Sequence, residues 1–207
     1  MKLFKKVLAV LCVFTLLFTL SSCGMFYKEV TFEEFKTQVN ANVKEANFNK
    51  AVVSYKSNSK EDGKETKEDR TYNFEYKKVL LVYTWSSTDS NLSVAEQGTA
   101  AMIAFELDIN LKNMVAAADE DDINDYKYYV KNGGYKLVYT EKNETSGSKT
   151  TTERTVEFNE YGLIVSVDAK STQTEGEEKT VSTATMTIKY SNTEEAKTTT
   201  TTTTSAK

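Results

Sequence analysis

The chain contains no histidine and no proline, and each absence excludes a class of function. Histidine is the commonest general base and the commonest metal ligand, so histidine-dependent catalytic triads and histidine-ligated zinc sites are excluded. A chain without proline has no polyproline recognition tract and no rigid proline spacer. The composition therefore removes the most frequent routes to catalysis and to zinc binding.

Cysteine and arginine are scarce. The only cysteines are Cys12 and Cys23, and the only arginines are Arg70 and Arg154. Lysine and arginine together number 26 against 30 acidic residues, a net charge of −4. A nucleic-acid binder needs clustered arginine and a basic face, so we expect no nucleic-acid partner.

The first 23 residues are typical of an export signal. A lysine-containing start precedes an apolar run from Val7 to Leu20, which is too short to span a bilayer comfortably. The small residues Ser21 and Ser22 then precede Cys23. This order of charge, apolar run, small residues and cysteine resembles the lipobox of bacterial lipoproteins.

The resemblance implies that Cys23 takes a diacylglyceryl group and that residues 1–22 are removed as a signal peptide. The mature protein is then held by lipid to the cell membrane and faces the outside of the cytoplasm. Residues 23–30 form a short tether. The seven residues 24–30 span roughly 25 Å at most, so we expect the domain close to the bilayer. The alternative is an ordinary secretory signal, or an uncleaved anchor, in which Cys23 has no special role.

Two capping boxes predict where helices begin. Thr31 with Glu34, followed by apolar residues at three- and four-residue spacing, predicts a helix over residues 31–46. Ser93 with Glu96 predicts a second helical segment, 93–118, which the stretch 108–110 divides into two helices.

Alternating apolar residues predict strands in the rest of the chain. Strands are expected near residues 51–55, 72–76 and 79–85, with a charged loop at 57–69. A meander follows from residue 126, with a tight turn at 132–134 and loops near 141–150 and 176. We expect one α+β domain over residues 31–190, before a disordered threonine-rich tail at 191–207. Its architecture is a curved, largely antiparallel sheet of about eight strands with an N-terminal helix and a helical insert.

The acidic run from Asp119 to Asp125 does not fit a calcium loop. Counted from Asp119, the sixth position must be glycine and the twelfth glutamate, but these are Asn124 and Val130. No serine–lysine pair or carboxylate pair stands out as catalytic either. We expect no metal, no cofactor and no enzymatic activity.

Aromatic and aliphatic side chains alternate on several predicted strands. They would line one face of the sheet, and two interpretations remain open. They either cover the core beneath the helices, as sheet aromatics usually do, or form a pocket for an apolar ligand. The candidate ligand-binding residues are Tyr72, Phe74, Tyr76, Tyr128, Val130, Tyr135, Leu137 and Tyr139.

The order of elements, a capped helix, antiparallel strands, a helical insert and a closing meander, is similar to that of the LolA/LppX-like lipoprotein and lipid carriers. The resemblance is one of architecture and implies a sheet that holds acyl chains beneath helices. We expect a monomeric lipoprotein that binds an apolar ligand or another envelope component. The alternative is a structural or surface-interaction lipoprotein without a small ligand.

Overall fold

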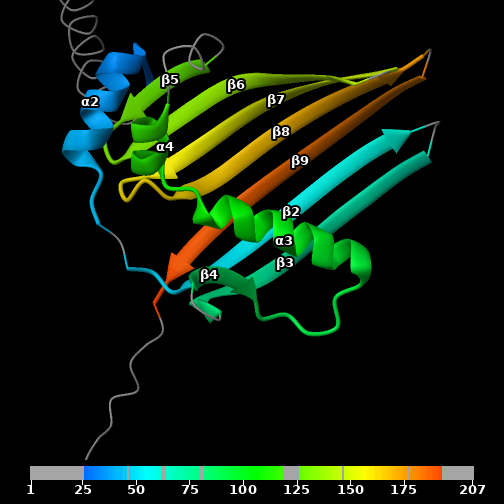
Figure 1. Cartoon of the computed structure of the whole chain (residues 1–207), viewed down its shortest axis with the longest axis horizontal. Coiled ribbons are helices and arrows are strands. Elements are labelled where there is room, and N and C mark those ends of the chain that lie inside the picture. The colour runs from blue at the N-terminus through cyan, green and yellow to red at the C-terminus, as the bar shows by residue number, and fades with distance from the viewer. Residues whose placement is uncertain are drawn as a thin grey trace, which may run out of the picture.

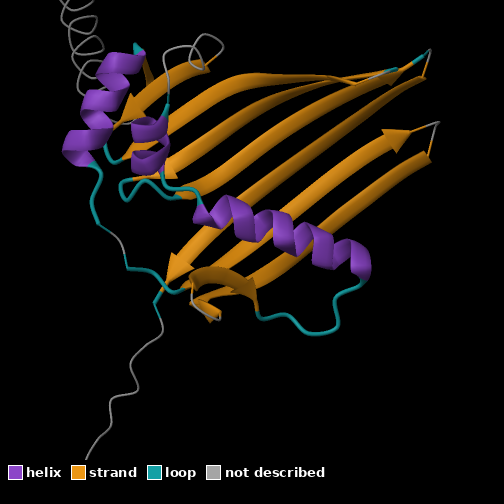
Figure 2. Cartoon of the chain, viewed as in Figure 1, coloured by secondary structure: helices purple, strands orange, loops and turns teal. Residues whose placement is uncertain are grey.

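The computed structural model describes residues 26–45, 47–61, 64–79, 82–118, 126–145, 147–176 and 178–192. Within these ranges, nine strands form one sheet, and three helices accompany it (Figures 1 and 2). In chain order the elements are β1 (Lys28–Val30), α2 (Phe32–Asn42), β2 (Lys50–Glu61), β3 (Lys64–Val79), β4 (Val82–Ser87), α3 (Val94–Asp108), α4 (Leu111–Ala117), β5 (Tyr126–Lys131), β6 (Gly134–Thr145), β7 (Ser148–Asn159), β8 (Ile164–Glu175) and β9 (Glu178–Ser191). Residues 1–22, Cys23, the acidic run and residues 193–207 lie outside the described residues.

The strands are arranged in the order β1-β5-β6-β7-β8-β9-β2-β3-β4, and every described pair is antiparallel. The sheet is open, with β1 and β4 at its edges. The α+β class and the antiparallel sheet are confirmed. The expected order is wrong at its start, because the three-residue strand β1 precedes α2 and pairs with β5.

Two segments predicted as loops are strands. Residues 57–61 and 64–69 belong to β2 and β3, which are paired as far as Glu61 and Lys64. Residues 141–150 belong largely to β6 and β7, which are paired as far as Thr145 and Ser148. The outer parts of these two hairpins, here called the polar arms, extend beyond the helices. Because no helix covers them, neither face needs apolar residues, and the sequence shows no apolar alternation there.

The helices begin where their capping boxes predict. The Thr31 hydroxyl accepts a hydrogen bond from the Glu34 backbone N–H, and Ser93 does the same for Glu96. The helical insert breaks at the predicted place. The Asn110 side chain accepts from the Lys112 N–H to cap α4, and Asn110 also forms a β-bridge with Leu163.

One face of the sheet carries the core, and all three helices lie on it (Figure 1). The register aligns Tyr128, Leu137, Val156, Val167 and Met186 in one row across the sheet, and all are buried. The opposite face alternates with this one and carries mainly threonine, serine and charged side chains. A single apolar layer between helices and sheet therefore supplies the hydrophobic stabilisation.

Candidate apolar site between α2, α4 and the sheet

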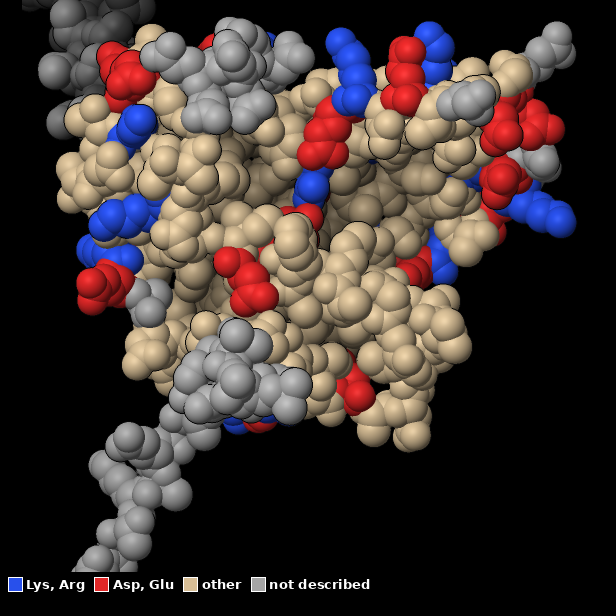
Figure 3. All heavy atoms as spheres, in the orientation of Figure 1, with Lys and Arg blue, Asp and Glu red and all other residues tan. Residues whose placement is uncertain are grey.

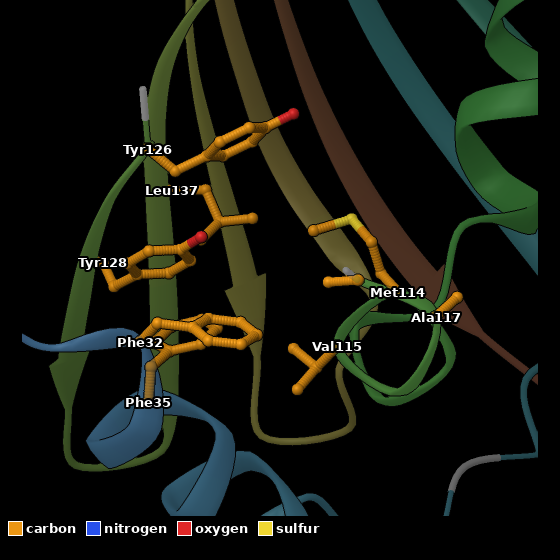
Figure 4. A pocket seen from close by; sticks show the side chains of 9 residues that line it. Phe32, Phe35, Met114, Val115, Ala117, Tyr126, Tyr128 and Leu137 are labelled. Carbon is orange, nitrogen blue, oxygen red and sulfur yellow. The ribbon is translucent and has the colours of Figure 1, made fainter. Parts of the chain in front are cut away.

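An apolar pocket of about 340 Å³ lies where α2 and α4 cover β5 and β6 (Figure 4). Its volume is at the lower end of the range for small-molecule sites. The lining residues are Phe32, Phe35, Met114, Val115, Ala117, Ala118, Tyr126, Tyr128 and Leu137. Among the described residues, no charged side chain lines it, so these walls favour an uncharged, apolar occupant.

Ring contacts fix the α2 wall of the pocket. The ring centroid of Tyr128 lies 5.2 Å from that of Phe32 and 5.1 Å from that of Phe35. Phe35 also meets Tyr135 edge-on, with centroids 5.8 Å apart. The Tyr135 hydroxyl donates to the carbonyl of Gln38, which ties α2 to β6. Aromatic pairs at these distances add stability beyond their buried area, so this wall is preorganised.

A glycine turn sets the position of α4. Gly162 has a φ of +67°, and a Cβ there would lie 3.1 Å from Val43 Cγ1 and 3.3 Å from Leu111 Cβ. The Leu111 N–H donates to the Gly162 carbonyl at 2.8 Å. Glycine therefore permits both the left-handed backbone and the close approach to α4. With α4 held there, Met114 and Val115 point toward the pocket (Figure 4).

Burial raises the pKa of two tyrosines in this region, Tyr128 and Tyr139. Burial, followed by the nearby Tyr126, raises the pKa of Tyr128 to about 12. Burial also raises the pKa of Tyr139 to about 12, and the Tyr139 ring stacks on Tyr126 with centroids 4.6 Å apart. The phenol of Tyr128, which lines the pocket, is therefore neutral at ordinary pH.

The eight candidate residues share the helix-covered face but do not form one pocket. Tyr128 and Leu137 line the pocket. Val130 and Tyr135 are paired with each other in the next row of the same face and are buried. Tyr139 is half-buried in the row on the opposite side of Tyr128 and Leu137. Four strands, β7, β8, β9 and β2, separate this group from β3.

On β3, the other candidates lie away from the pocket. Tyr72 and Phe74 are fully buried in the core, and Tyr76 is 41% exposed with its ring 5.3 Å from Trp85. Sequence reasoning missed the helical walls, although the stripes that contain Phe35 and Met114 were visible as the buried sides of helices.

Other hollows are less suited to an apolar ligand. Two larger hollows, of about 520 and 550 Å³, are lined mainly by polar and charged residues such as Lys127, Glu153 and Lys131. Among the described residues, no three acidic side chains are grouped so that they could hold a metal ion. In the same part of the chain, no helix has the length and apolar character needed to cross a membrane.

Comparison with known proteins found no match, either to a protein-family model or to a curated protein sequence.

Proposed function

We propose that this protein is an extracytoplasmic lipoprotein, anchored through Cys23, that binds an acyl chain in the pocket between α2, α4 and β5–β6. The observation that carries the proposal is the lining that the described residues give the pocket, which consists of uncharged aromatic and aliphatic side chains. An acyl chain offers only apolar surface, so such a lining gains free energy from burying it and loses none by desolvating charge.

The place of the pocket in the chain supports a membrane-derived ligand. Four residues separate Cys23 from Lys28, where β1 begins, and the five extended steps between these two residues span roughly 18 Å. β1 pairs with β5, the strand that contributes Tyr126 and Tyr128 to the pocket. A lipid on Cys23 would therefore keep the pocket within a short distance of the bilayer.

Binding is tested with a chain that begins at Gly24, which retains every described element and the whole core. A fluorescent fatty acid should bind it at one saturable site. Met114→Trp should weaken binding by tenfold or more, because the larger ring fills space that the ligand needs. Ala116→Trp is the matched control, since Ala116 lies on the same helix, is exposed and does not line the pocket.

A structural or surface-interaction role is the second candidate, and the exposed apolar side of α3 favours it. The same titration separates the two. Binding without saturation, or equal weakening by both tryptophan variants, would contradict the ligand-binding proposal and leave the interaction role.

A further inference from the structure

Helix α3 is apolar on the side that faces away from the sheet. Its outward residues Val94, Met102 and Phe105 are 86%, 48% and 71% exposed. At helical spacing, they lie on one stripe with the exposed small residues Gly98 and Ala101. An isolated exposed apolar residue is ordinary, but a continuous apolar stripe marks an interaction surface.

Ion pairs hold α3 in a fixed orientation, so this side cannot turn inward. Glu96 pairs with Arg70 of β3, and Glu106 pairs with Arg154 of β7. These use the only two arginines of the chain. Asp108 accepts a hydrogen bond from Thr84 of β4 at 3.2 Å. The helix is fastened near both ends, and its apolar stripe stays exposed.

Charge argues against a bilayer as the occupant. No lysine or arginine occurs from Val79 to Leu111. Figure 3 shows the helix-covered face, where Lys and Arg side chains gather mainly at the margins rather than over α3. Helices that lie on membranes carry a basic polar border that binds anionic lipids, and α3 lacks one. The surface fits a protein instead.

Gly98 indicates what kind of protein surface fits. Glycine in the middle of a helix is destabilising, and nothing in the described structure requires it, since an added Cβ would meet no atom within 4 Å. A glycine on an exposed stripe leaves a hole into which a large side chain of a partner can fit.

The same stripe supplies that side chain. If two α3 helices pack antiparallel with Gly98 opposite Met102 of a second copy, Val94 lies beside Phe105 of that copy. Asp108 then lies beside the N-terminal end of the other α3, where the positive end of the helix dipole favours a carboxylate. A two-fold axis repeats each of these contacts.

We propose that α3 is a homodimer interface, in which two copies pack antiparallel through Val94, Gly98, Met102 and Phe105. The inference is independent of the apolar pocket. A dimer differs from the monomer expected from the sequence. The exposed apolar stripe can be recognised only when the structure shows which side of α3 is buried.

Sedimentation equilibrium of the chain that begins at Gly24 tests the proposal. The chain should form dimers, and Met102→Glu should weaken dimerisation at least tenfold. Val52→Glu, a matched change at a 39% exposed residue of β2, should leave the dimer intact. Gly98→Leu should raise the melting temperature while weakening the dimer, because it improves the helix and fills the hole.

Cross-linking provides the register. The chain from Gly24 contains no cysteine, so a Gly98→Cys chain mixed with a Met102→Cys chain should give a heterodimeric disulfide on oxidation. A chain that stays monomeric at every concentration up to about 1 mM, the Kd of a very weak complex, would overturn the proposal. Phe105-dependent flotation with anionic vesicles would overturn it in favour of the bilayer.

Discussion

Single residues determine how the helices meet the sheet. Gly162 combines a positive φ with contacts that leave no room for a side chain, whereas Gly176 has a φ of +59° and open space around it. Both glycines could be predicted as turn residues from their polar surroundings. The close approach of Gly162 to α4 could not, because it depends on two segments about 50 residues apart in the chain.

Gly162→Ala and Gly176→Ala form a matched pair at this scale. Gly176→Ala should cost about 1 kcal/mol of unfolding free energy, from backbone strain alone. Gly162→Ala should cost about 3 kcal/mol, because overpacking against Val43 and Leu111 adds to that strain. Urea denaturation measures both. Equal losses would show that α4 can move away at no cost, contrary to the account of how the pocket is positioned.

At the scale of elements, local signals in the sequence predicted where the helices begin. The ends of the strands were predicted wrongly where the strands extend into polar arms. Thr31, Ser93 and Asn110 act within one helical turn, so the sequence near each cap is enough to reveal it. The extent of β2 and β3 depends on pairing between polar residues that face each other across the hairpin. Lys56 with Asp69 and Asn58 with Glu65 are examples of contacts that no periodicity indicates.

The Glu106–Arg154 pair should account for much of the attachment of α3. The side chains of Glu106 and Arg154 are 12% and 21% exposed. Glu106→Gln leaves the guanidinium without its counter-charge and should cost about 3 kcal/mol, near the lower end for a buried pair. Lys56→Gln, which breaks an exposed pair with Asp69, should cost less than about 1 kcal/mol. Similar losses in urea denaturation would contradict the view that α3 is held by its ion pairs.

At the scale of the whole molecule, the described residues form one helix-covered sheet, and its strand order could not be read from the sequence. The order places β9 beside β2 and thereby separates β3 from β6 by four strands and from β5 by five. The candidate residues on β3 and on β5–β6 have the same alternation in the sequence, so pattern alone could not assign them to different places. Only Tyr128 and Leu137 of the eight line the pocket.

Buried tyrosines across the sheet should make the fold sensitive to alkali. Burial raises the pKa of Tyr72, Tyr128 and Tyr139 from the ordinary 10 to about 12 each. The folded state therefore favours the protonated phenols. Their contribution to stability is complete below pH 10 and is lost as the pH rises through about 12.

The urea concentration at the unfolding midpoint should fall as the pH rises from 10 to about 12. This fall should be smaller for Tyr128→Phe than for the parent chain. An equal fall in both would show that Tyr128 does not contribute to the alkaline loss.

Native mass spectrometry of the intact protein, extracted from its own membrane, tests the central claim most directly. The account predicts a chain that begins at Cys23, carries a covalent diacylglyceryl group and holds one further lipid non-covalently. Met114→Trp should remove the non-covalent lipid and keep the covalent one. A chain that still begins at Met1, or a mature chain without any bound lipid, would contradict the account.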